Sequence, residues 1–544
     1  METDGDFLPW LCAHRRWYRP PVEPGSRDFV LAEPGQQPLD RVLSELGATF
    51  GVAGDGRIRS VRRRWLDTFD WRLYRAGLTL YQVTGRGTSE LTLTGPDGQR
   101  LTAPAGRSRW PALAGALPPG PLRDRVARIS GIRALLPVAA AVSHVREFRL
   151  LNEDEKTVAR LAVDEPSLPA SAETAATVLP TRLSVIEVRG YQAAARRARR
   201  LLADVAGVAV SRMTPLDAAL HATGRQAADF SGRVDVALRP AMPGRDAVAA
   251  ILLQQLDIVE QCVDGVLRDI DTEFLHDLRV AVRRTRSALK LVGDVLPGEL
   301  TLRFASEFRW LGDVTTPVRD LDVHMLSFPP MAAKLVAAGP ADLEPFHAFL
   351  GRRRTAERRR LNRALRSARF ASVAGDWRKA LLAAQDARRV PPGPSAAGLS
   401  AARARRAHAR VIKLGSAITP ASPAESLHTL RKRCKELRYV LEFFASLHDP
   451  AVYRAAIADL KRLQDCLGEF QDSQVQREEI QALAVAMLSQ RAAAAPTLLA
   501  MGELAAQLGE RQRQARAEFA DTFAQFAGPP GRRRMAALTT AAAS

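Results

Sequence analysis

Two segments of this chain carry a histidine and three cations at the same spacing. The first segment begins at His276 and the second at His428, and in each a cation follows three, seven and ten residues later. At about 100° per residue, these positions fall within about 80° on one side of a helix. Like charges at this spacing repel one another, so folding alone gives no reason for the pattern, whereas an extended anion would stabilise it. The first basic stripe comprises His276, Arg279, Arg283 and Arg286, and the second comprises His428, Arg431, Lys435 and Arg438.

The side chains of the two stripes suit phosphate groups. Arginine offers a planar fork of donors that matches phosphate oxygens, and lysine adds a compact point charge. Binding would be driven by charge neutralisation and by the release of counterions. The two histidines could donate to a phosphate or fix a neighbouring helix, and the sequence leaves both roles open. The alternative is a solvated basic helix face, with the histidines hydrogen-bonded between helices.

The sequence that follows the two stripes is duplicated as well. Asp320 and Asp472 lie downstream of the stripes and are 152 residues apart, as the two histidines are. The register therefore holds without a gap, which favours a duplicated helical module over a chance basic face. One departure is Thr315-Thr316, which stands where the second copy has Leu467-Gly468. We expect this departure to leave the basic stripe untouched.

Three aspartates near the stripes have two possible roles. Asp320, Asp322 and Asp472 could hold a metal ion, or they could orient the arginines and cap helices. We favour the second role, because no histidine or carboxylate cluster in the sequence completes a metal site. The sequence thus predicts no metal, no cofactor and no catalytic residue.

The overall charge limits the kinds of partner. A net charge of +20 over 544 residues indicates nucleic acid, an anionic membrane or another polyanion. Acidic residues at the N-terminus argue against a signal peptide, and no segment approaches the ~20 apolar residues of a membrane-spanning helix. We therefore expect a cytoplasmic protein with no membrane contact. The cysteines, which we expect to be reduced thiols, are Cys12, Cys262, Cys434 and Cys466.

The chain changes character near residue 240. Before it, alternating segments such as residues 78–83 and 89–94, separated by turns that contain glycine, indicate antiparallel strands in an α+β domain. From Asp246 onward the apolar period is 3.6, as in long helices. The predicted divisions are an α+β domain at 1–213, a linker at 214–242, helical repeats at 243–395 and 396–528, and a basic flexible tail at 529–544.

The second half of the chain resembles the CHAD family, the conserved-histidine α-helical domain. The matching residues are His276-x-x-Arg279-x-x-x-Arg283-Arg284-x-Arg286 with Arg319-Asp320-Leu321-Asp322, and His428-x-x-Arg431-x-x-x-Lys435-x-x-Arg438-Tyr439 with Leu463-Gln464-Asp465. The resemblance covers roughly 243–528. It implies an all-α domain of two pseudo-symmetric four-helix bundles with a positively charged central groove. It also implies binding of inorganic polyphosphate and association with polyphosphate granules.

The first half resembles the CYTH family, the triphosphate tunnel metalloenzymes, which implies an antiparallel β-barrel-like domain. The clearest trace is the segment from Leu66 to Leu78. CYTH enzymes open with a Glu-x-Glu-x-Lys strand that holds the catalytic metal, and residues 26–33 here lack that motif. Because Mg²⁺ needs carboxylates and the phosphates need cations, we predict that this domain is degenerate and that the protein is not an enzyme.

The sequence therefore predicts a multidomain, non-catalytic protein that binds polyphosphate. The first alternative is non-specific nucleic-acid binding, which is disfavoured because aromatic residues that would stack on bases are few beside the stripes. The second is a metal-dependent triphosphatase of the CYTH type. The oligomeric state is left open. The predicted polyphosphate-binding residues are His276, Arg279, Arg283, Arg284, Arg286, Lys290, His428, Arg431, Lys432, Lys435, Arg438 and Tyr439.

Overall fold

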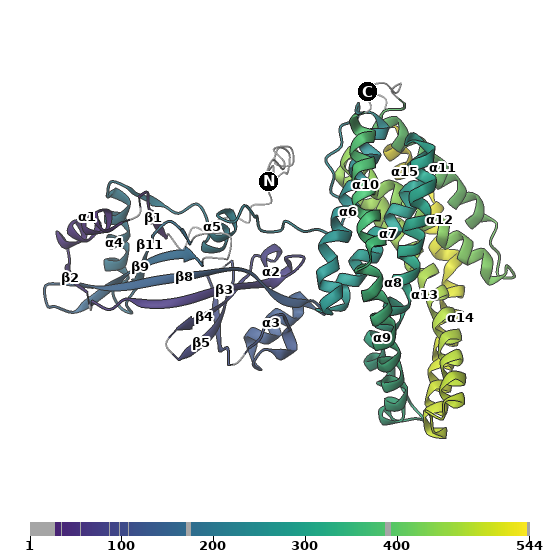
Figure 1. Cartoon of the computed structure of the whole chain (residues 1–544), viewed down its shortest axis with the longest axis horizontal. Helices are drawn as coiled ribbons and strands as arrows, with labels where there is room; N and C mark the ends of the chain where they lie inside the picture. Colours follow the sequence, from purple (N-terminus) through teal and green to yellow (C-terminus); the bar gives the residue numbers. More distant parts are fainter. Residues whose placement is uncertain are drawn as a thin grey trace. The chain divides into compact units, whose positions relative to one another are not determined.

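The chain divides into two compact units. The computed structural model describes residues 28–33, 35–54, 56–85, 87–96, 98–106, 108–169, 176–386 and 393–540. The boundary falls between Ser231 and Gly232, within the stretch predicted as a linker. Part of that stretch is folded, because helix α5 (Pro215–His221) belongs to the first unit. We call residues 28–231 the sheet unit and residues 232–540 the helical unit (Figure 1).

The sheet unit is built on one antiparallel sheet, as predicted. Its hydrogen-bonded order is β12-β1-β11-β9-β8-β3-β4-β5-β6, and β2 and β7 pair with β8 while β10 pairs with β9. The strands are β1 (Phe29–Leu31), β2 (Gly51–Gly54), β3 (Arg59–Thr68), β4 (Thr79–Gly85), β5 (Thr88–Thr94), β6 (Arg100–Pro104), β7 (Ala112–Leu113), β8 (Ala134–Leu151), β9 (Thr157–Leu168), β10 (Thr177–Val178), β11 (Arg182–Glu187) and β12 (Val208–Val210). The helices are α1 (Gln36–Gly47), α2 (Arg72–Arg75), α3 (Pro121–Ser130), α4 (Gln192–Asp204) and α5, with a 3₁₀ turn at Ala114–Ala116.

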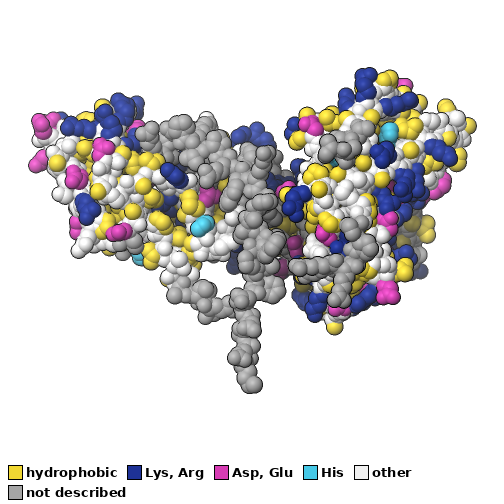
Figure 2. Space-filling model, turned by 90° about the horizontal axis from the view of Figure 1, so that it is seen from above, with side chains coloured by type: hydrophobic (Ala, Val, Ile, Leu, Met, Phe, Trp, Pro, Cys, Tyr) yellow, Lys and Arg dark blue, Asp and Glu magenta, His cyan; other side chains and the backbone are white. Residues whose placement is uncertain are grey.

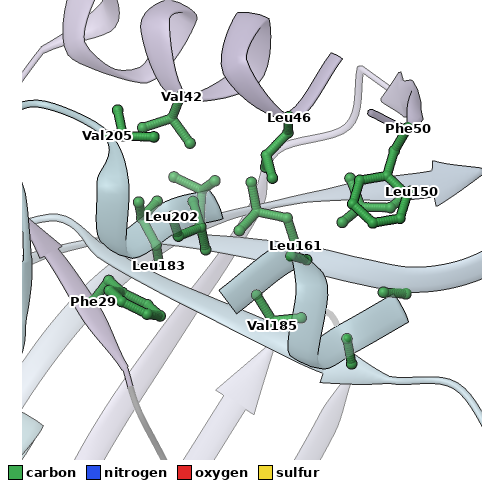
Figure 3. Packing of buried hydrophobic residues seen from close by; sticks show 14 of the residues in the cluster. Phe29, Val42, Leu46, Phe50, Leu150, Leu161, Leu183, Val185, Leu202 and Val205 are labelled. Carbon is green, nitrogen blue, oxygen red and sulfur yellow. The ribbon is translucent and has the colours of Figure 1, made fainter. Parts of the chain in front are cut away.

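A hydrophobic core joins α1 and α4 to one part of the sheet. Val42 and Leu46 of α1 and Leu202 of α4 are completely buried, and they pack with strand residues such as Phe29 and Leu161 (Figure 3). Burying a side chain of this kind contributes about 1.5–3 kcal/mol. This packing fixes β1 beside β11 and β11 beside β9, which places strands that line a cavity described below.

The helical unit contains the predicted duplication. Helices α6, α7 and α8 begin 152 residues before α11, α12 and α13, respectively, so the register of the sequence repeat is also the register of the fold. The fourth helical segment of each repeat is split, into α9 and α10 in the first and into α14 and α15 in the second. The helices are α6 (Gly244–Arg268), α7 (Thr272–Val292), α8 (Gly298–Ala332), α9 (Glu344–Leu365), α10 (Ala368–Asp386), α11 (Ala396–Ser416), α12 (Ala424–Phe443), α13 (Pro450–Ser489), α14 (Ala495–Ala527) and α15 (Pro529–Thr540). Short 3₁₀ turns occupy Gly293–Val295, Pro340–Leu343 and Ala445–Leu447.

The prediction of a flexible tail is wrong for residues 529–540, which form α15. Proline is compatible with the first turn of a helix, so the Pro529-Pro530 pair starts this helix instead of preventing it. Met535 and Leu538 are buried, and Arg534 forms an ion pair with Asp459 of α13. Residues 541–544 lie outside the described residues.

Two further predictions concern the cysteines and membranes. Within the described ranges no cysteine forms a disulfide, and Cys434 is buried in α12. Cys12 lies outside the described residues. Of the helices that the structure describes, none is both long and apolar enough to cross a bilayer.

Candidate anion-binding site

The two basic stripes lie on α7 and α12, which pack against each other. Helix α7 starts at the N-cap Asp271, whose carboxylate accepts hydrogen bonds from the amides of Glu273 (2.9 Å) and Phe274 (3.3 Å). Gly265 of α6 allows α7 to approach closely, because a Cβ at this position would lie 2.2 Å from the Phe274 ring. The apolar face of each helix is buried, and this holds the basic stripes on the other side.

Two ion pairs between α7 and α12 obey the internal symmetry. Arg284 Nη2 lies 3.1 Å from Glu442 Oε2, and Lys290 Nζ lies 2.7 Å from Glu436 Oε1. Positions 284 and 436 are equivalent, and so are positions 290 and 442, so the second pair repeats the first with the charges exchanged. Both pairs link the two repeats.

These ion pairs change the role of two predicted binding residues. Arg284 is only 9% exposed, and it also donates to the carbonyl oxygen of Gly232 (2.5 Å). It is therefore a structural residue of the interface between α7 and α12. Lys290 remains exposed, but its ammonium group is engaged by Glu436. The signal that could have revealed these pairs was the opposite charge at equivalent positions of the two repeats.

Cations from both repeats lie near one another. Arg283 and Lys435 are equivalent positions, and they lie close enough for the charge of Arg283 to act on Lys435. Burial, together with the charges of Arg431 and Arg283, lowers the pKa of Lys435 to about 8. Arg438 lowers this pKa further, and Asp472 opposes the shift. We call Arg283, Arg431, Lys435 and Arg438 the central cation cluster.

The ring of Tyr439 packs against two arginines of this cluster. The guanidinium carbons of Arg283 and Arg438 lie 6.0 Å and 5.6 Å from the centroid of its ring. The tyrosine is only 3% exposed, so a ligand on the surface would meet the arginines and not the ring. Tyr439, predicted as a binding residue, is therefore placed to orient the guanidinium groups through cation–π contacts.

The equivalent arginines of the two stripes have different partners. Arg279 Nη1 donates to the carbonyl oxygen of Gly312 (3.2 Å) and to the hydroxyls of Thr315 (3.1 Å) and Thr316 (2.7 Å). Arg431 Nη2 donates instead to Asp472 Oδ1 (2.8 Å). The expectation that the Thr315-Thr316 departure leaves the stripe untouched is wrong, because both hydroxyls bind a stripe arginine.

The remaining predicted residues occupy the same helices. His428 Nδ1 lies 2.7 Å from Gln471 Oε1 of α13, a contact that fixes a neighbouring helix. His276 is half-buried, and Arg286 and Lys432 are exposed. Arg319 was not predicted, although its charge acts on Arg279 and it donates to the carbonyl oxygen of Thr272 (3.4 Å). Figure 2 shows lysine and arginine side chains at several places on the visible face of the helical unit.

The aspartates near the stripes hold arginines. Asp322 is buried and accepts a hydrogen bond from Arg354 Nε (2.5 Å), and Asp472 accepts from Arg431. Asp320 lies near Arg279, and burial raises the pKa of its carboxyl against the influence of that arginine. Within the described part of the chain, no group of three or more histidine, cysteine or acidic side chains is arranged to hold a metal ion.

Comparison with known proteins identifies the helical unit. A family model for the CHAD domain matches residues 250–481, while no curated protein matches the chain. The CHAD domain of the plant Ricinus communis is 29% identical, covers 54% of this chain and 96% of its own, and has a TM-score of 0.47. PptA from Streptomyces chartreusis is 17% identical, with coverages of 52% and 99% and a TM-score of 0.41.

Other solved structures match a smaller part of this chain, with lower TM-scores. One is a "putative adenylate cyclase" from Bacillus halodurans, which is 17% identical, covers 35% of this chain and 95% of its own, and has a TM-score of 0.25. The CHAD domain predicted from the two histidine motifs is confirmed by the family model, and both motifs lie inside residues 250–481. This chain therefore contains a CHAD domain, preceded by an antiparallel-sheet unit.

Proposed function

We propose that the helical unit binds inorganic polyphosphate at the central cation cluster and the adjoining stripes. The observation that carries this proposal is the convergence of Arg283, Arg431 and Lys435 from two repeats. The lowered pKa of Lys435, caused by burial and then by Arg431 and Arg283, reflects a local excess of positive charge. Such an excess is unfavourable in the unliganded protein and is relieved by a polyanion.

The surroundings of Tyr439 favour a polyanion without bases over nucleic acid. Base recognition on single strands relies on aromatic rings that stack on the bases. Tyr439, which follows Arg438 of the second stripe, is buried beneath two guanidinium groups, so its ring is not accessible for stacking on a base. Arginine and lysine donors directed at a repeating anion suit a phosphate chain.

We further propose that the protein resides in the cytoplasm on polyphosphate granules and that the sheet unit is not a triphosphatase. Asp164 of β9 and Glu187 of β11 are two carboxylates of that unit. Asp164 accepts a hydrogen bond from Arg63 (3.1 Å), and Glu187 accepts one from Arg199 (2.7 Å). A catalytic metal ion would need these carboxylates as ligands, but their negative charges are already balanced by the two arginines. Metal-dependent turnover of triphosphate that is lost in Asp164→Asn with Glu187→Gln would contradict this part of the proposal.

Competition binding tests the proposed ligand. Labelled long-chain polyphosphate is bound to the full chain and displaced by RNA, duplex DNA or triphosphate at matched salt. We expect unlabelled polyphosphate to displace the labelled ligand better than any of these three competitors. The variant Arg283→Ala with Lys435→Ala should bind more weakly, and the slope of log K against log salt should fall by about 1.4 if each residue neutralises one phosphate.

A matched control separates the site from general charge. Lys379→Ala with Lys461→Ala removes two exposed cations from α10 and α13, outside the stripes. We expect this control to retain most of the affinity of the parent protein. Equal displacement by RNA or DNA would indicate a general polyanion surface. An equal loss of affinity in both double variants would show that the central cation cluster is not the binding site.

A further inference from the structure

The sheet unit contains a cavity of its own. Its volume is about 380 Å³, and it lies between β1, β3 and β11 and the segment that follows β12. Pockets that bind small molecules have volumes of about 300–1,000 Å³ and are mostly apolar with a few well-placed polar groups. The walls here include Val30, Trp65, Val210 and Met213, so the interior is largely apolar. The cavity is thus the size of a small ligand with an apolar body.

The charged residues that line this cavity are all arginines. Arg63, Arg182 and Arg212 contribute to its walls, whereas Asp164 and Asp28, the partners of the first two, do not. The side chain of Arg182 is 8% exposed and is held by Asp28 and by the carbonyl oxygen of Met213 (3.2 Å). A ligand inside the cavity therefore faces positioned guanidinium groups, of which those of Arg63 and Arg182 are paired with aspartates outside the lining.

Arg63 is fixed as well. Its Nη1 donates to Asp164, and its guanidinium carbon lies 5.8 Å from the ring centroids of both Trp65 and Tyr81. Stacking on two aromatic rings holds a guanidinium group in one orientation. Arg63 thus presents a positioned guanidinium group, paired with Asp164, beside the apolar wall formed by Trp65.

The rim of the cavity is apolar and partly open to solvent. Val210 is 49% exposed and Met213 is 41% exposed, and both line the cavity. Arg212 lies between them in the chain and is exposed. An apolar entrance with a cation beside it suits a molecule whose apolar part enters while its charged end stays near the rim.

We propose that this cavity binds a monoanion with an apolar body, of the class of medium-chain carboxylates. The carboxylate pairs with Arg212, and the chain packs against Trp65, Val210 and Met213. A phosphate chain suits the cavity poorly, because its apolar walls would remove water from the phosphate oxygens without replacing the lost hydrogen bonds. This site is independent of the polyphosphate site proposed for the helical unit.

Calorimetric titration of the full chain with decanoate, below its micelle-forming concentration, tests the proposal. We expect saturable binding of one decanoate, and binding of 1-decanol that is about tenfold weaker, because the alcohol lacks the charge that pairs with arginine. Tripolyphosphate should not displace decanoate. Absence of saturable binding, equal affinity for the alcohol, or displacement by tripolyphosphate would each overturn the assignment.

Two variants locate the binding. Arg212→Glu reverses an exposed charge at the rim and should weaken decanoate binding about tenfold, whereas Arg41→Glu, an equal reversal on the exposed surface of α1, should leave it unchanged. Ala218→Trp fills the cavity from α5 and should abolish binding. Unchanged binding in Arg212→Glu, or in a folded Ala218→Trp protein, would place the ligand elsewhere and overturn the proposal. Because Arg212 is exposed, its variant remains informative even if the tryptophan variant does not fold.

Discussion

The two repeats of the helical unit use equivalent arginines in different ways. In the first repeat, Arg279 is held by a backbone carbonyl and by the hydroxyls of Thr315 and Thr316, all of which belong to α8. In the second, Arg431 pairs with Asp472, whose side chain is 59% exposed. A phosphate can replace an exposed carboxylate as the partner of a guanidinium group, because both present anionic oxygens. For the polyphosphate site that we propose, we therefore expect the second repeat to contribute more of the binding energy than the first.

The two ion pairs between α7 and α12 should differ most in their contribution to the free energy of unfolding. Arg284 and Glu442 are both less than 20% exposed, whereas Lys290 in the equivalent pair is 65% exposed. Removing one partner of a buried pair typically costs about 3–5 kcal/mol, while an exposed pair contributes about 0–1 kcal/mol. Glu442 keeps Arg438 as a partner (3.3 Å), so the loss on removing Arg284 should lie at the lower end of the first range. Arg284→Met should therefore destabilise the protein far more than Lys290→Met. Urea unfolding measures both, and similar losses would contradict the structural role of Arg284.

Replacing the equivalent arginines Arg279 and Arg431 should have different effects on polyphosphate affinity and on the free energy of unfolding. Arg431→Ala should weaken polyphosphate binding by about tenfold or more, because a charge-assisted contact is lost. Arg279→Ala should affect binding less and lower the free energy of unfolding by about 1–3 kcal/mol, since buried acceptors on α8 lose their donor.

Polyphosphate titrations and urea unfolding of the same two variants make this comparison. A loss of affinity in Arg279→Ala equal to that in Arg431→Ala would show that the repeats contribute equally.

The central pair of cations should make binding depend on pH. Lys435 has a pKa of about 8, lowered by burial and by Arg431 and Arg283, whereas the equivalent position in the first repeat is an arginine, Arg283. Binding of a polyanion is weakened when the lysine loses its charge, so affinity should be highest well below pH 8 and fall above it, by at most about tenfold per pH unit. Lys435→Arg should remove this dependence. Cys434 does not interfere, because burial raises its pKa to about 12.

The same lysine affects the stability of the unliganded protein with the opposite sign. A lysine with a lowered pKa binds fewer protons in the folded state than in the unfolded state between pH 8 and 10.5. Its contribution to the free energy of unfolding should therefore rise with pH across this window. A pH series of urea unfolding in the parent protein and in Lys435→Arg separates this effect from other titrating groups.

The sequence was sufficient for the features that depend on spacing along one element. The positions of the stripes, the 152-residue register and strands such as residues 78–83 follow from local periodicity. It was insufficient where the outcome depends on a partner from another helix. The sequence does not show that Arg284 of α7 pairs with Glu442 of α12. Nor does it show that the ring of Tyr439 lies beneath the guanidinium groups of Arg283 and Arg438. The basic tail was misjudged because composition cannot reveal the packing of Met535 and Leu538.

Converting the first repeat toward the second is the finest test of their difference. Thr315→Val with Thr316→Ala removes the two hydroxyls that accept from Arg279, and the valine keeps the shape of the buried threonine. Freed from these acceptors, Arg279 keeps only the Gly312 carbonyl among its hydrogen-bond partners named above and can turn toward a ligand. We expect polyphosphate affinity to rise by about twofold to fivefold, a gain of less than 1 kcal/mol. The free energy of unfolding should fall by about 0.5–1.5 kcal/mol per lost hydrogen bond. Unchanged affinity together with lowered stability would mean that the hydroxyls serve folding alone, and that the asymmetry of the two repeats has another origin.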